Sequence, residues 1–317
     1  MFGFFKKSNM NNKKKIFLIL AAIFLLIFFW IFNYQGVSNK NDGNLSVVTT
    51  LFPYYDFARI IGGDKAEVSL LLPPGVEPHS FEPKPSDIFK MNSADIFVYT
   101  GDFMEPWAKD ILAGINNKKI SVVRTGDIVN LLNGNEEGLS SGIDPHIWLD
   151  LSNSENIVDG IASAFVRKDP QNSDLYIQNA HELKNGLRDL DNSFVAGLSN
   201  CRTKTLVYGG HYAFGYLVKR YSLNYLAAQG LAPDSEPTAQ DLARLINELK
   251  KNNIEYVFYE ELSSPKIAET ISGETGAKLI LLNAAHNVTR ADMNKGVSFI
   301  DIMKENLVNL KMGLECK

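Results

Sequence analysis

The stretch Ser173–Ser199, SDLYIQNAHELKNGLRDLDNSFVAGLS, has the longest helical pattern in the chain. Its apolar side chains recur at intervals of three and four residues, at Leu183, Leu187, Leu190, Phe194 and Leu198. This spacing is the period of an amphipathic α-helix. A helix of this length reaches about 40 Å, which is too long to cover a single sheet. We therefore predict a strut that joins two domains.

Short β-rich runs alternate with amphipathic helical stretches on both sides of this helix. We predict strands at residues 46–51, 66–72, 96–99, 119–123, 205–208, 223–227, 256–259 and 278–282. We predict helices at residues 54–61, from 86, 103–113, 152–167, 212–221, 239–252, 265–275 and 297–312. The alternation is typical of an α/β fold with mainly parallel sheets. We expect an N-terminal lobe at 46–170, a linking helix at 171–200 and a C-terminal lobe at 201–317.

The first 45 residues are predicted to lie outside the folded body. Five lysines, from Lys6 to Lys15, precede an unbroken apolar run from Ile16 to Phe32. As a helix this run would reach roughly 25 Å, so it suits a signal peptide or a signal anchor. Only the weak cleavage sequence Gly36–Ser38 follows, and we favour an uncleaved anchor with its lysines inside. Residues 35–45 are expected to be a flexible tether to the outer face of a bacterial membrane.

The folded body is acidic. Residues 1–44 contain six lysines and one aspartate, so the remaining chain has a net charge of −9, against −4 for the whole chain. An acidic surface disfavours nucleic acid as a partner.

Cys201 and Cys316 are the only cysteines, and they are too far apart for a CxxC metal clasp. Outside the cytoplasm they could form a disulfide, or they could be two separate thiols. A disulfide would close a loop of more than a hundred residues, worth about 4 kcal/mol in a chain-entropy model.

Four of the five histidines lie in loops next to predicted elements. His79 follows strand 66–72 in a loop that Pro78, Pro83 and Pro85 stiffen. His211 and His286 follow strands 205–208 and 278–282, and His146 precedes helix 152–167. Ligands of open α/β sheets gather at the carboxyl ends of strands, so we predict a shared site between the two lobes. His181 lies within the long helix and is expected to be solvated.

Several motifs carry a family resemblance that covers Ser46 to the C-terminus. They are Gly75–Asp87 (GVEPHSFEPKPSD), Asp144–Asp150 (DPHIWLD), His211–Tyr216 (HYAFGY), Gly230–Thr238 (GLAPDSEPT) and Glu260–Pro265 (EELSSP). Together they resemble the metal-binding receptors of ABC importers for zinc and manganese, also called cluster A-I or TroA-like solute-binding proteins. The resemblance implies a receptor, not an enzyme, that binds a metal ion between two lobes. Its implied partners are an ABC permease and the associated ATPase.

The resemblance also implies the metal ligands. Three loops of such receptors supply one histidine each, which corresponds to His79, His146 and His211. The fourth ligand is usually a carboxylate, but this chain has His286 where members have a glutamate. Four neutral imidazoles suit tetrahedral Zn²⁺, whereas Mn²⁺ prefers carboxylate oxygens, so we expect Zn²⁺ as the bound ion and keep Mn²⁺ as the alternative. Affinity should fall below about pH 6, where imidazole becomes protonated.

Five acidic residues in these motifs have two interpretations each. Asp144 and Asp150 are candidates for fixing a histidine tautomer, and ordinary loop and helix-start roles are equally open. A zinc hydrolase would need a general base such as Glu260 or Glu261, with Glu77 as a third candidate. We expect these glutamates to be ordinary loop and helix-start charges. A surface adhesin with the same fold is a third functional hypothesis.

Overall fold

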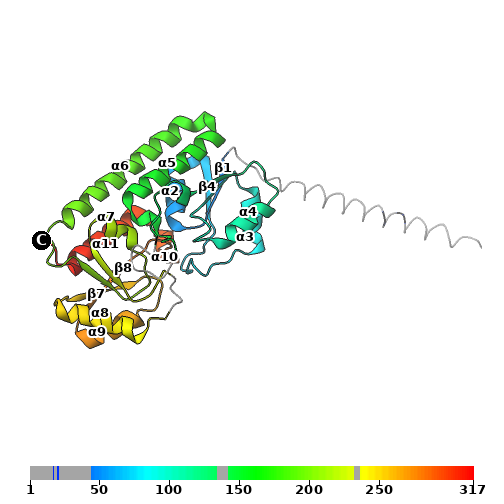
Figure 1. The fold of residues 1–317 in the computed structure, drawn as a ribbon. Coiled ribbons are helices and arrows are strands. Elements are labelled where there is room, and N and C mark those ends of the chain that lie inside the picture. The colour runs from blue at the N-terminus through cyan, green and yellow to red at the C-terminus, as the bar shows by residue number, and fades with distance from the viewer. Residues whose placement is uncertain (1–16, 18–19, 21–43, 134–141, 232–235) are drawn as a thin grey trace, which may run out of the picture. The chain divides into compact units, whose positions relative to one another are not determined.

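Two four-stranded sheets, each with all strands parallel, form the framework of the protein (Figure 1). The computed structural model describes residues 17, 20, 44–133, 142–231 and 236–317. The first sheet has the order β2-β1-β3-β4, with β1 (Leu45–Thr49), β2 (Ala66–Leu70), β3 (Ile96–Tyr99) and β4 (Ser121–Arg124). The second has the order β6-β5-β7-β8, with β5 (Thr205–Tyr208), β6 (Asn224–Ala227), β7 (Tyr256–Glu260) and β8 (Lys278–Leu282). The predicted α/β class with two mainly parallel sheets is confirmed.

Helices connect the strands in both lobes. They are α2 (Phe52–Gly62), α3 (Pro85–Ser93), α4 (Pro106–Gly114), α5 (Leu151–Lys168), α7 (Gly215–Arg220), α8 (Ala239–Lys251), α9 (Lys266–Thr275), α10 (Arg290–Lys295) and α11 (Phe299–Gly313). Single 3-10 turns lie at Gly63–Lys65, Thr125–Asp127, Ile147–Leu149 and Pro170–Asn172. The sequence missed α10, because six residues are too few to show a helical period. The helix predicted at 212–221 begins only at Gly215, which leaves residues 209–214 as a loop.

The predicted long helix is α6 (Ser173–Gly197), and it links the two lobes as expected. Its 25 residues correspond to about 37 Å of helix. The helix packs against α2 and α5 of the first lobe and against α11 of the second. Gly186 and Gly197 permit the approach of α11: a Cβ atom there would lie 3.1 Å from Ile300 Cδ1 and 3.2 Å from Leu307 Cδ1.

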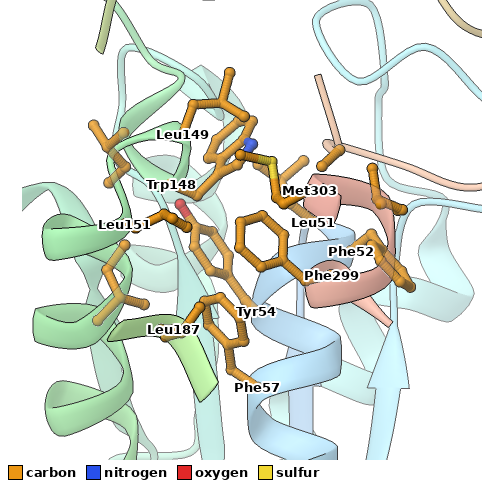
Figure 2. Close-up of a cluster of buried hydrophobic side chains, with 14 of the residues drawn as sticks. Leu51, Phe52, Tyr54, Phe57, Trp148, Leu149, Leu151, Leu187, Phe299 and Met303 are labelled. Carbon is orange, nitrogen blue, oxygen red and sulfur yellow. The ribbon is translucent and has the colours of Figure 1, made fainter. Parts of the chain in front are cut away.

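A continuous hydrophobic core joins the lobes (Figure 2). The rings of Phe57 and Phe299, from the first and last helices of the described fold, meet edge to face with centroids 5.2 Å apart. Beside them, Asp56 Oδ2 accepts a hydrogen bond of 2.9 Å from the backbone N–H of Phe299. The indole N–H of Trp148 donates to the carbonyl of Ala284 at 2.8 Å. These contacts cross from one lobe to the other, so they hold the lobes in a fixed relation.

Cys201 and Cys316 are partly buried and pack against this core. A disulfide joins Cys201 to Cys316 and so ties the C-terminus to the chain just after α6.

Backbone contacts divide the protein into Met1–Gly43 and Asn44–Lys317. Within the described residues, no helix has the length and apolar character needed to cross a membrane. The apolar run 16–32, predicted to be a signal peptide or membrane anchor, lies outside the described residues except for positions 17 and 20.

Candidate metal site

The structure brings three of the four predicted histidines together. His79 comes from the loop after β2, His146 directly precedes the 3-10 turn Ile147–Leu149, and His211 lies in the loop after β5. One ring nitrogen from each side chain lies within 4.8 Å of the other two. His146 and His211 are fully buried. The first lobe supplies His79 and His146 and the second supplies His211, so the group spans both lobes.

A carboxylate orients the ring of His146. Asp144 Oδ1 lies 2.9 Å from His146 Nδ1 and also accepts the backbone N–H of His146 at 3.0 Å. A proton on Nδ1 leaves the lone pair of Nε2 available to a metal. The sequence-based hypothesis that Asp144 fixes a tautomer therefore matches the geometry. Gly215 makes room for this carboxylate, because a Cβ atom there would collide with Asp144 Oδ2.

A second carboxylate faces His211. Glu260 Oε1 lies 2.6 Å from His211 Nδ1 in a short contact whose angle departs from that of a good hydrogen bond. Glu260 is buried at the end of β7, the strand next to β5. A Cβ atom on Gly210 would lie 2.8 Å from Glu260 Oε2, so glycine again permits the approach. The sequence-based expectation for Glu260, an ordinary loop charge, was wrong; its place at the end of a strand was the available signal.

The Nε2 atoms of His146 and His211 point toward each other. They are 3.1 Å apart, and both Nδ1 atoms face a carboxylate. The His79 ring centroid lies 5.4 Å from that of His146 and 5.3 Å from that of His211. His79 Nε2 is buried and has no hydrogen-bond partner among the described residues. Tetrahedral zinc, with bonds of about 2.0–2.1 Å, separates its ligand nitrogens by about 3.3 Å, so the residues present fit such an ion.

His286 lies beside this group without being part of it. Its side chain is buried, and its ring centroid is 6.2 Å from that of His211. His286 Nδ1 lies 3.8 Å from Glu261 Oε1, beyond hydrogen-bond length. Glu261 lies in the loop directly after β7, where a charge was expected, and its side chain is buried.

The remaining candidates have structural roles. Asp150 caps α5 through the N–H of Ser152 and pairs with Arg220 at 3.0 Å, so it orients no histidine. Glu77 accepts the backbone N–H of Ser80 at 3.0 Å within its own loop. His181 is exposed on α6, as expected.

Burial favours the neutral form of three imidazoles, those of His79, His146 and His286. Burial, with a smaller contribution from His211, lowers the pKa of His79 to about 3. Burial also lowers the pKa values of His146 and His286 well below the usual range. Burial, followed by repulsion from Glu260, raises the pKa of Glu261 to about 8. Neutral imidazole is the form that binds a metal, so little protonation opposes binding at these three rings.

The fold has two α/β lobes with parallel sheets, one long helix joins them, and histidines from both lobes meet between them. These features are those of a two-lobed receptor for a metal ion. Residues 47–313 match the family described as zinc-uptake complex component A, periplasmic. The chain belongs to this family. It is therefore an extracytoplasmic solute-binding component of a zinc-uptake system and not an enzyme, which removes the hydrolase hypothesis.

Relatives and solved structures support this assignment. The chain is 35% identical over 310 residues to the high-affinity zinc uptake system protein ZnuA of Bacillus subtilis, covering 94% of this chain and 97% of that protein. The Zn(II)-bound ZnuA-like domain of Streptococcus pneumoniae AdcA is 36% identical with a TM-score of 0.75, over 86% of this chain and 100% of that chain. A laminin-binding protein of Streptococcus agalactiae, described as having adhesin and metal-transporting activity, is 29% identical with a TM-score of 0.76, over 86% and 100%. The chain spans 61% of the length of zinc-binding protein AdcA of Streptococcus pyogenes.

Proposed function

We propose that the protein binds one Zn²⁺ through the Nε2 atoms of His79, His146 and His211 and delivers it to an ABC permease and its ATPase. His286 is the proposed fourth ligand. The observation that carries the proposal is the 3.1 Å approach of the His146 and His211 Nε2 atoms, with a carboxylate at each opposite nitrogen. Names of the relatives support zinc as the ion.

The chemistry of this approach favours a cation. Two ring nitrogens at 3.1 Å repel each other unless one proton or one cation lies between their lone pairs. A metal ion can replace that proton and take lone pairs from both rings. Neutral nitrogen donors suit Zn²⁺ better than Mn²⁺, which prefers oxygen ligands.

We further propose how the chain is organised around this site. Residues 46–170 and 201–317 are the metal-binding lobes, and 171–200 is the linking helix. Residues 1–45 hold the receptor at the outer face of the membrane, through the basic segment and apolar run found in the sequence. Because contacts between the lobes hold them in a fixed relation, we propose that the ion is released by local movement of the loops that hold its ligands.

Titration of the full chain with Zn²⁺ and Mn²⁺ tests the proposed ligands. We expect one Zn²⁺ per chain, tighter binding of Zn²⁺ than of Mn²⁺, and at least a hundredfold loss for His146→Ala or His211→Ala. The matched control is His181→Ala, which removes an exposed imidazole on α6 and should leave the affinity unchanged. Unchanged zinc affinity in the His79, His146 and His211 variants, or a preference for Mn²⁺, would overturn the proposal.

Adhesion is the second candidate, favoured by the similarity to the Streptococcus agalactiae laminin-binding protein, which is described as having adhesin activity. Deletion of the gene separates the two functions. A growth defect that added zinc corrects supports the importer. Loss of attachment with normal zinc uptake supports the adhesin.

A further inference from the structure

We propose that Glu261 is the positioning residue that makes His286 the fourth metal ligand. This inference rests on the proposed function, because it assigns a role within the same site. His286 has a carboxylate neighbour just as His146 and His211 do, but that contact is still open. Its closure would orient His286 when the ion binds.

The first support is a pair of buried atoms without partners. His286 and Glu261 have exposed fractions of 1% and 8%. Within the described part of the chain, neither His286 Nδ1 nor Glu261 Oε2 has a hydrogen-bond partner. Leaving a buried polar group unpaired costs about 1–3 kcal/mol, so a hydrogen bond between His286 Nδ1 and the Glu261 carboxyl group would be favourable. Their side chains are 3.8 Å apart at closest approach of Nδ1 to Oε1.

The second support is the pattern of the neighbouring rings. Asp144 lies 2.9 Å from His146 Nδ1, and Glu260 lies 2.6 Å from His211 Nδ1. Glu261 follows Glu260 at the end of β7 and extends this pattern to the next ring. A hydrogen bond from Nδ1–H to Glu261 would leave Nε2 of His286 as the metal-binding atom.

The third support is that the backbone around both residues is held in place. Glu261 Oε1 accepts the N–H of Ala284 at 2.9 Å, and the His286 carbonyl accepts the N–H of Phe52 at 3.1 Å. The Asn287 side chain donates to the carbonyls of Pro73 and Val76 at 2.8 and 2.7 Å. A shift of about 1 Å by the His286 ring, without movement of the loop, is enough to reach hydrogen-bond length.

A double-mutant cycle on the full chain tests the role of Glu261. Zn²⁺ affinity is measured for the wild type, Glu261→Gln, His286→Ala and the double variant, with thermal unfolding of each metal-free protein as the folding control. We expect Glu261→Gln to weaken binding by roughly tenfold to a hundredfold in the wild type. In the His286→Ala background we expect less than about threefold, because Glu261 then has no ring to orient. Equal losses in both backgrounds would overturn the proposal.

Cobalt supplies a readout that a merely structural role would not change. Co²⁺ replaces Zn²⁺, and a four-coordinate ion gives much stronger visible bands than a five- or six-coordinate ion. We expect both Glu261→Gln and His286→Ala to weaken these bands in the same way. A wild-type spectrum in Glu261→Gln would contradict the proposal. If the wild type binds no zinc, or if His146→Ala binds it normally, the proposed function itself fails.

Discussion

The two lobes have the same strand order, but the point where that order reverses has a different role in each. In the second lobe, the neighbouring strands β5 and β7 lead into His211 and Glu260, which contact each other beside the histidine cluster. In the first lobe, β1 and β3 lead into Thr50 and Thr100, and both donate to the buried carboxylate of Glu105. The switch point of a parallel sheet is where ligands usually bind, but the first lobe fills its own switch point with a side chain. Topology therefore supplies the position, and the side chains decide whether a ligand can use it.

Replacing Glu105 should have the largest effect, and on stability alone. Its carboxylate accepts the hydroxyl of Thr50 at 2.6 Å and the N–H groups of Thr100 and Gly101 at 3.0 Å. Glu105→Ala leaves these donors without an acceptor, so we expect a loss of about 3 kcal/mol in the free energy of unfolding. Urea denaturation of the metal-free chain measures it. A fall in zinc affinity in Glu105→Ala would contradict the conclusion that this carboxylate has only a structural role in the first lobe.

Glu260→Gln tests the corresponding carboxylate in the second lobe. Here we expect a tenfold to hundredfold loss of Zn²⁺ affinity, because the amide orients the His211 ring less strongly than the carboxylate. The effect on unfolding should be smaller than that of Glu105→Ala. Calorimetric titration and urea denaturation of both variants give the two values. The same affinity in Glu260→Gln and wild type would show that the second lobe's carboxylate is structural, like that of the first.

Proton release tests the close approach of His146 and His211. The lowered pKa values of His79, His146 and His286 mean that these rings are already neutral near pH 6 and release no proton. A neutral ring carries one proton, which Nδ1 can hold while Nε2 binds the ion, so these three rings should contribute less than one released proton per Zn²⁺ near pH 6. Calorimetry at pH 6 in buffers of different ionisation enthalpy counts the protons. Release of three or four would mean that the rings behave as ordinary solvated imidazoles.

Gly215→Ala should have the smallest effect on binding. The new Cβ atom would press on Asp144, which must then move away from His146 Nδ1. We expect a loss of about threefold to tenfold in Zn²⁺ affinity, below that for a lost carboxylate. The control is Gly273→Ala on α9, where a Cβ atom meets nothing within 4 Å. Equal affinities of the two variants would show that Asp144 does not depend on Gly215.

Most of the fold could be predicted because its signals are local. The strands β3, β5 and β8 have the predicted bounds, since each is a short apolar run between polar or glycine residues. The spacing of the apolar residues in α6 gave its length to within two residues. By contrast, α10 is only six residues long and has no such pattern.

The sequence predicted a shared site for four histidines, of which the structure brings three together, but the carboxylates beside them could not all be assigned. Asp144 lies two residues from His146, so the sequence itself suggests their contact. Glu260 is 49 residues from His211, and only the pairing of β5 with β7 brings them together. The expected fall in affinity below pH 6 also used the ordinary pKa of imidazole. Burial in the folded protein lowers that pKa for His79, which sequence alone cannot show.

Zinc K-edge X-ray absorption of the full chain, loaded with one Zn²⁺, tests the central claim most directly. We predict nitrogen ligands at about 2.0–2.1 Å with the scattering pattern of at least three imidazole rings. His146→Ala and His211→Ala should each remove one ring from that pattern, and His181→Ala should remove none. A zinc shell without imidazole, or an imidazole count that His146→Ala and His211→Ala leave unchanged, would contradict a site built from both lobes.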